Sequence, residues 1–298
     1  TVKQSKDEDN IESIKNNDED NIESINNNDE DNIESIQDGN LILQCTQGTN
    51  DPLNTWIKAK GPIGGLGHNV RYRHDNPNIM YFTDVWSGVQ KSVDGGLNWV
   101  LSNGEGEEYI DFRVGPSLDN IPIYALRIDP NDEDIVWAGL QDNGGLYKSY
   151  DGGQTWESKS EGLDSNYVVP QEKIHNSEEE DEDVTELDLT VRMIEVEPDN
   201  SNIVYVGALG NLWKESEDRG IYKTTNGGKS WKKILYVDDK TGIIDMVMDA
   251  NNPNIVYAAT YQRMRKVWGF NGGGAGSGIY KTTNGGTNWS KLSQGLPS

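Results

Sequence analysis

The chain has 298 residues, which allows one large domain or two small ones, and it carries a net charge of −24. No apolar run approaches the roughly 18 residues that a membrane span needs. Nucleic acid and anionic lipid are not expected as partners, because both require a basic face. One cysteine, Cys45, excludes an internal disulfide and a multi-cysteine metal site.

Much of the acidic charge lies at the start of the chain. Residues 1–38 hold 13 acidic residues and 3 lysines, and the sequence Asp7–Ile14 recurs at 18–25 and 29–36. An eleven-residue period can support a helix with an apolar stripe, but each period here offers only two isoleucines among like charges. We expect residues 1–45 to form a disordered, solvated tail, or else a tail that orders on a partner. Residues 46–67 read as a lead-in segment.

Four related units follow, at about 68–102, 122–160, 190–235 and 243–294. Leu126–Gly139, for example, aligns with Ile194–Gly207. Each unit reads as two strands around an Asp/Asn/Pro turn, a variable loop, a third strand, a tight turn and a fourth strand. Four short antiparallel strands repeated at this period predict an all-β fold built from the blades of a β-propeller. An acidic insertion at 160–188 separates the second unit from the third.

The tight turn is the most regular feature of the units. It reads hydroxyl, any residue, Asp or Asn, Gly, Gly, any residue, Asn/Ser/Thr, Trp, and it occurs at Ser92–Trp99, Ser149–Trp156, Thr224–Trp231 and Thr282–Trp289. Gly-Gly supplies positive φ, and the hydroxyl and Asp/Asn side chains can accept backbone N–H groups. These features assign a structural role to Asp94, Trp99, Asp151, Trp156, Asn226, Trp231, Asn284 and Trp289.

The turn resembles the Asp-box, or bacterial neuraminidase repeat. That repeat occurs in sialidases, xyloglucan-cleaving glycosidases, sortilin-type receptors and a photosystem assembly factor. The resemblance covers roughly residues 60–294 and implies a propeller, while its activity stays open because the fold hosts enzymes and binders alike. Such relatives usually have six or more blades, so we expect further blades in a longer chain or from a partner. An open arc would otherwise leave strand edges unpaired.

The functional residues are expected in the loops between the second and third strands, because the Asp-box turns occupy the opposite edge of each blade. Tyr81–Gly88 resembles a segment of the xyloglucan-cleaving family whose aspartate is catalytic, which makes Asp84 the catalytic candidate. Phe82, Trp86 and Ser87 depart from that segment, and the family's second acid belongs to a second propeller. The other loops offer flat aromatic rings, carboxylates and cations for a ligand: Trp86, Asp142, Trp213, Glu215, Arg219, Tyr261, Arg263 and Trp268.

Three functional interpretations remain open. The first is a glycoside hydrolase-like propeller that binds or cleaves polysaccharide, the second a sortilin-type propeller that binds peptide or protein, and the third an assembly scaffold. The Arg-Ile-Pro pattern of sialidases is absent. No cofactor and no metal are expected, since His68, His74 and His175 are scattered. We expect a secreted, periplasmic or cell-surface protein, although no signal peptide is visible.

Overall fold

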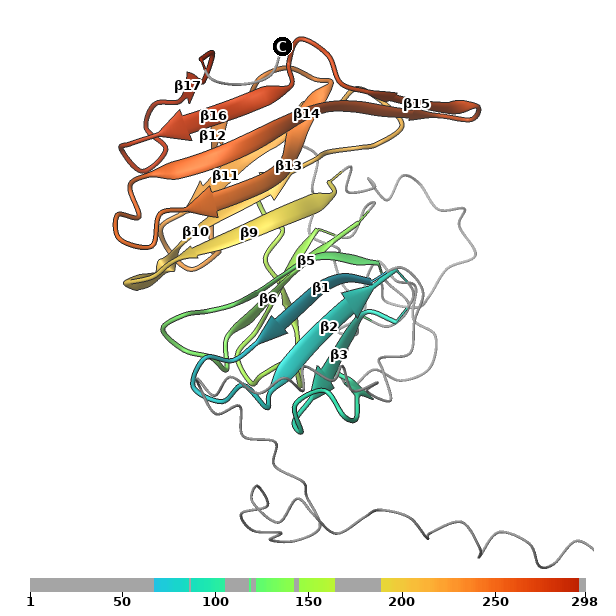
Figure 1. Cartoon of the computed structure of the whole chain (residues 1–298), viewed down its shortest axis with the longest axis vertical. Coiled ribbons are helices and arrows are strands. Elements are labelled where there is room, and N and C mark those ends of the chain that lie inside the picture. The colour runs from blue at the N-terminus through green and yellow to red at the C-terminus, as the bar shows by residue number, and fades with distance from the viewer. Residues whose placement is uncertain are drawn as a thin grey trace, which may run out of the picture. The chain divides into compact units, whose positions relative to one another are not determined.

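A computed structural model describes residues 67–85, 87–104, 118, 122–141, 145–163 and 189–294. The acidic tail, nearly all of the lead-in segment and most of the acidic insertion lie outside these residues. The described residues fold into four antiparallel sheets that follow one another in chain order, as Figure 1 shows. The predicted all-β architecture is therefore confirmed.

Each of the first three sheets contains four strands paired in chain order. The first contains β1 (Gly67–Tyr72), β2 (Met80–Asp84), β3 (Val89–Ser92) and β4 (Val100–Leu101). The second contains β5 (Ile123–Ile128), β6 (Val136–Leu140), β7 (Leu146–Ser149) and β8 (Glu157–Ser158). The third contains β9 (Val191–Glu197), β10 (Asn200–Ala208), β11 (Gly220–Thr224) and β12 (Lys232–Leu235). We call these sheets blades one to three.

The fourth blade differs from the sequence prediction. It pairs β13 (Thr241–Met248), β14 (Val256–Lys266), β16 (Gly278–Thr282) and β17 (Ser290–Lys291). Tyr261, Arg263 and Trp268 were expected in a loop, but β14 runs on to Lys266 and pairs with β15 (Gly269–Gly272). The returning strand reads Gly-Phe-Asn-Gly, whose intrinsic strand preference is low. The hairpin forms because each backbone finds a partner in the other.

The Asp-box turns connect the last two strands of each blade. All eight of their glycines have φ between 64° and 91°. In the first turn the Ser92 hydroxyl accepts the Gly96 amide at 2.9 Å, and the Asp94 carboxylate accepts the Asn98 amide at 2.9 Å. The other three turns repeat both bonds, with Asn226 and Asn284 replacing the aspartate. Each turn thus pairs two of its amides internally, while its first glycine donates to the turn between the first two strands, as Gly95 does to Asn78 O at 2.9 Å.

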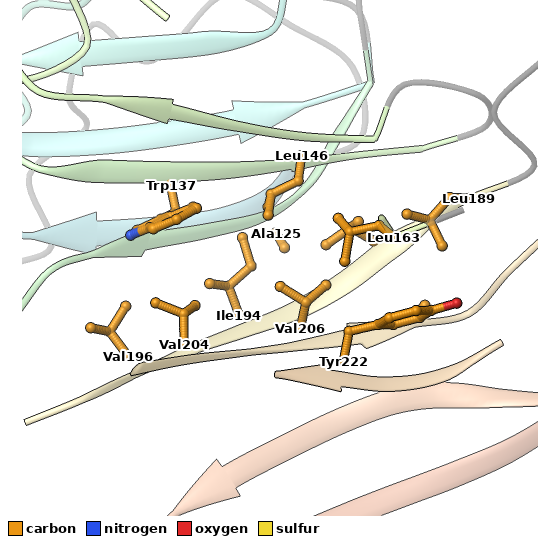
Figure 2. Packing of buried hydrophobic residues seen from close by; sticks show 12 residues of the cluster. Ala125, Trp137, Leu146, Leu163, Leu189, Ile194, Val196, Val204, Val206 and Tyr222 are labelled. Atoms are coloured by element: carbon orange, nitrogen blue, oxygen red, sulfur yellow. The ribbon is translucent and has the colours of Figure 1, made fainter. Parts of the chain in front are cut away.

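The core lies between neighbouring blades. The first strands pack in series, β1 against β5, β5 against β9 and β9 against β13. Each interface has its own apolar cluster, and each cluster receives the Asp-box tryptophan of the later blade: Trp156, Trp231 and Trp289. Figure 2 shows the cluster between blades two and three, where Trp137 and Leu146 face Ile194, Val204 and Val206. The stack is therefore held by burial between sheets.

The first two Asp-box turns should make the fold acid-sensitive. Burial acts to raise the pKa of Asp94 and Asp151, but hydrogen bonds from each turn outweigh it and hold both pKa values below the usual value. A lowered folded-state pKa means that this stabilisation is present above the unfolded pKa of about 4 and is lost as pH falls through the folded pKa. Asp94→Asn with Asp151→Asn should remove this component, because Asn does not titrate.

The measurement is the thermal midpoint of both proteins as pH is lowered from about 7 to about 3. The midpoint of the natural chain should fall more steeply in the acid range than that of the double variant. The same pH dependence in both proteins would contradict an acid-labile role for these carboxylates. The third and fourth turns serve as internal controls, since they already carry Asn226 and Asn284.

Candidate functional site

The candidate site lies at the blade edge opposite the Asp-box turns, which we call the loop edge. The second strands of the blades end at this edge, with Asp84, Leu140 and Ala208 as their last residues in blades one to three. The first strands begin there, because they pair antiparallel to the second strands. Side chains of several blades can therefore meet at the loop edge.

A β-bulge occurs at the same place in every blade, close to the start of the first strand. The register between first and second strand skips one residue at each bulge, and the skipped residues are His68, Tyr124, Arg192 and Ile244. A bulge re-aims the side chain of its extra residue and is frequent beside functional sites. The repeat therefore presents one re-aimed side chain per blade at the loop edge.

The bulge residues of the first three blades converge on the Tyr124 ring. The His68 ring meets it edge-on with centroids 4.2 Å apart, and the Arg192 guanidinium carbon lies 5.2 Å from its centroid. Asn69 donates its side-chain amide to the Tyr124 carbonyl at 2.8 Å. We call His68, Asn69, Tyr124 and Arg192 the bulge cluster. It combines a flat ring, a cation and hydrogen-bonding groups from three blades.

Asp84 lies beside the bulge cluster and is fully buried. It pairs in register with Gly67, the residue before His68. Its carboxylate accepts the Ser87 amide at 2.6 Å and the Ser87 hydroxyl at 2.8 Å. The predicted catalytic candidate therefore anchors the loop that follows β2. Trp86, in the same loop, lies outside the described residues, as does Asp142.

The electrostatics of His68 reflect these neighbours. Burial and the positive charge of Arg192 lower the pKa of His68, while the negative charge of Asp84 acts to raise it. The lowered pKa favours the neutral imidazole near pH 7. The His68 Nε2 atom is buried and finds no hydrogen-bond partner among the described residues. Neutral His68 thus offers an unused hydrogen-bonding nitrogen next to the Tyr124 ring.

An ion pair joins two of the same first strands further along. Arg127 of β5 forms an ion pair with Glu195 of β9 at 3.1 Å. Burial raises the pKa of Glu195, although the charges of Arg127 and Arg71 oppose the rise. Burial also lowers the pKa of Arg71 on β1. The Arg127–Glu195 pair thus ties β5 to β9, whereas the like charge of Arg127 adds to burial in lowering the pKa of Arg71.

Arg219 was predicted to offer its cationic side chain to a ligand, but the structure buries that side chain. It is fully buried and donates to the carbonyls of Leu209 at 2.9 Å and Asn211 at 2.5 Å, with a longer contact of 3.3 Å to the Lys214 carbonyl. Its guanidinium is therefore committed to the β10–β11 loop. Burial lowers the pKa of Arg219, while nearby acidic groups act to raise it.

A second group of predicted residues gathers on blades three and four. The Arg265 guanidinium lies 5.8 Å from the Trp213 ring centroid, and its amide donates to Leu212 O at 2.6 Å. Arg263 lies 5.6 Å from the Phe270 ring centroid. Trp213 and Phe270 are more than half exposed, and Trp268 at the hairpin tip is 85% exposed. We call these five residues the aromatic–arginine surface.

The remaining predicted residues flank this surface. Tyr261 is half-buried on β14, and its hydroxyl lies against Gly272 of β15. Glu215 is paired with Lys240 at 3.1 Å, and this hydrogen-bonded partner lowers the pKa of Glu215. Asp84, in contrast, belongs to the first blade. The predicted residues therefore fall into two groups on different blades.

Sequence reasoning missed most of the bulge cluster. His68 was expected to be a surface or turn histidine, and neither Tyr124 nor Arg192 was singled out. Tyr124 and Arg192 each lie two residues before the aligned segments that begin at Leu126 and Ile194. A bulge leaves no residue-type signature here, since the four extra residues are His, Tyr, Arg and Ile.

The described ranges contain no group of three or more His, Cys, Asp or Glu side chains that could hold a metal ion. They also contain no helix long and apolar enough to cross a bilayer.

Comparisons with known proteins give distant matches. No protein-family model matches the chain. A xyloglucanase of Hypocrea jecorina (strain QM6a) is 23% identical over 164 residues, which are 52% of this chain and 18% of that protein. Xyloglucanase Xgh74A of Acetivibrio thermocellus is 26% identical over 175 residues, which are 53% of this chain and 18% of that protein.

The fold has a counterpart in a solved structure. The crystal structure of an ancestral GH74 enzyme superposes with a TM-score of 0.53 at 19% identity, covering 78% of this chain and 25% of that chain. The chain therefore spans a small part of the proteins that it matches. Its sequence is distantly similar to these xyloglucanases, and its fold is similar to that of the ancestral GH74 enzyme.

Arg219→Met should destabilise the chain more than an arginine change on the surface. The substitution leaves the carbonyls of the β10–β11 loop without their charged donor, which should lower the free energy of unfolding by about 3 kcal/mol. Arg265→Met is the matched control, because it removes a half-exposed cation–π contact and should cost less than about 1 kcal/mol. Denaturant unfolding measures both values. Equal losses would contradict the assigned role of Arg219.

Proposed function

We propose that this chain binds a polysaccharide of the xyloglucan class across its loop edge. The observation that carries the proposal is the convergence of His68 and Arg192 on the Tyr124 ring, with Asn69 bonded to the Tyr124 carbonyl. A flat ring surrounded by a few directed polar groups is the usual composition of a ligand site. The distant similarity to xyloglucanases supports a polysaccharide as the ligand.

The aromatic–arginine surface would extend the same binding face. Trp213 and Phe270 are exposed rings, each with an arginine stacked on it. Exposed aromatic rings that gather on one surface are typical of an interaction site. A long polysaccharide could contact several such rings at once, because its sugar units repeat along the chain.

We propose in addition that any cleavage of the polysaccharide depends on Asp84. Glycoside hydrolysis usually needs two carboxylates at a set separation. Asp84 is one carboxylate at the loop edge, but Ser87 occupies both of its oxygens. Binding is therefore the primary proposal, and cleavage would require a second acid and a rearrangement of the Ser87 loop.

Tyr124→Ala should weaken binding to soluble xyloglucan by about tenfold, equivalent to about 1.4 kcal/mol, because it removes the ring on which the cluster is built. Tyr124→Phe should retain most of the affinity. Tyr150→Ala is the matched control, since Tyr150 is exposed on the Asp-box side of the second blade. Isothermal titration calorimetry measures the affinities. Unchanged affinity in Tyr124→Ala would exclude the bulge cluster as the binding site.

Asp84→Asn separates a chemical role from a structural one. If Asp84 takes part in cleavage, release of reducing ends from xyloglucan should fall to background while affinity is retained. If Asp84 only holds the loop, the thermal midpoint and the affinity should fall together, because the amide NH₂ opposes a donor from Ser87. Ser87→Ala is the control, since it removes one of the two bonds and keeps the carboxylate. Absence of turnover in the natural chain would leave binding alone.

A peptide or protein ligand is the second candidate. The observation that favours it is the β14–β15 hairpin, whose Val267 and Trp268 are 92% and 85% exposed. Exposed apolar side chains on a projecting hairpin are typical of protein contacts. A screen of glycans and peptides in parallel distinguishes the two ligands. Peptide binding that Trp268→Ala abolishes, with no glycan binding, would replace the polysaccharide proposal.

A further inference from the structure

Every blade carries an aromatic residue paired with a lysine across its second and third strands. The pairs are in register at Tyr81 and Lys91, Trp137 and Lys148, Tyr205 and Lys223, and Tyr257 and Lys281. In each pair the lysine ammonium lies over its own ring, at 5.4, 4.7, 4.7 and 4.9 Å from the centroid. The repeat thus places one aromatic–lysine pair at the same position in all four blades.

Two of these pairs donate hydrogen bonds to the Asp-box turn of the following blade. Tyr81 and Lys91 both donate to the Gly152 carbonyl, at 3.0 and 2.8 Å. Tyr205 and Lys223 both donate to the Gly285 carbonyl, at 3.1 and 2.8 Å. Both tyrosines are buried at these contacts, and this burial raises the pKa of Tyr81 and of Tyr205 to about 12.

The Trp137–Lys148 pair of the second blade contacts the Asp-box turn of the third blade at the equivalent position, but through different groups. Trp137 has no hydroxyl, and its ring packs edge-on against Trp231 with centroids 6.3 Å apart. The Lys148 ammonium lies next to Gly227, the first glycine of the third Asp-box. Three successive pairs therefore face three successive Asp-box turns.

The contact also runs in the opposite direction. Trp156 donates its indole N–H to the Ser102 carbonyl of the first blade at 2.9 Å, and Trp231 donates to the Lys159 carbonyl of the second blade at 2.9 Å. Each acceptor follows the tryptophan of its own blade by three residues. Leu292 stands at this position in the fourth blade, and its amide bonds to Ile279 O at 2.8 Å as the Ser102 amide bonds to Val89 O.

The fourth blade carries an aromatic–lysine pair, but no Asp-box turn of the described residues packs against that pair. Tyr257 and Lys281 make no hydrogen bond to an Asp-box carbonyl within residues 67–294 as described. Tyr257 stays half-exposed, whereas Tyr81 and Tyr205 are fully buried. Figure 1 shows β14 and β16, which carry the pair, at one end of the series of sheets.

We propose that Tyr257, Lys281 and the Leu292 carbonyl form a docking site for a further Asp-box blade. The carbonyl of that blade's first turn glycine accepts from Tyr257 and Lys281, and its tryptophan donates to Leu292 O. The turn requires glycine at the contact, because Gly152 and Gly285 have φ of 68° and 64°. The partner is thus a β-hairpin with a Gly-Gly turn and a tryptophan, and not an apolar surface of another kind.

The test extends the full chain by one blade. A second copy of residues 241–294 is fused after Ser298, and hydrogen–deuterium exchange is measured in the added Asp-box turn. We expect exchange at its glycine amides to be slowed by roughly tenfold or more relative to the same segment as a free peptide. Tyr257→Phe with Lys281→Met should remove this protection, and alanine at the first glycine of the added turn should remove it as well.

Tyr280→Phe with Lys291→Met is the matched control. This pair is also in register on the fourth blade, but Tyr280 packs toward the third blade. Protection should survive in this control, and exchange in β9 and β10 should stay unchanged in all variants, which shows that the chain remains folded. An added turn that exchanges like the free peptide overturns the proposal. Protection that persists in Tyr257→Phe with Lys281→Met, or that falls on dilution because a second copy supplies it, also overturns the proposal.

Discussion

The contact between the aromatic–lysine pair of one blade and the Asp-box turn of the next blade is the one on which the rest of this structure depends. A main-chain carbonyl receives two donors at the first and third interfaces, and a tryptophan returns a hydrogen bond to the earlier blade at the first and second. Buried polar groups that are paired in this way orient the apolar sheets that they join. The apolar clusters between blades supply burial, but burial alone has no direction.

The orientation of the blades in turn creates the candidate site. The first strands pack in series, and each carries a bulge at the same position, so the bulged side chains of neighbouring blades come within reach of one another. The repeat fixes the geometry while the residue at the bulge is free to vary. This separation lets one scaffold hold different chemistry, which is the general relation between fold and function. Here the variation places a histidine, a tyrosine and an arginine together.

Much of the fold could be predicted, and only part of the site. The Asp-box turns and the strand order followed from residue types and spacing. The exposed aromatic residues Trp213 and Trp268 do lie in the predicted loops, and Arg265 stacks on Trp213. The buried role of Arg219 was not predicted, because the sequence does not show whether a loop arginine faces water or three carbonyls. The β14–β15 hairpin was not foreseen either, because its return strand is rich in glycine.

The sequence by itself determined the local structure. The hydroxyl and Asp/Asn side chains of an Asp-box turn bond to amides within the same eight residues, and its glycines need positive φ whatever surrounds them, so eight letters predict the turn. Only the tertiary structure decided which side chains meet. Tyr124 and Arg192 are 68 residues apart, and they touch because the bulges and the packing of the first strands bring them to one edge. Contacts of that range depend on how sheets stack, which no single segment encodes.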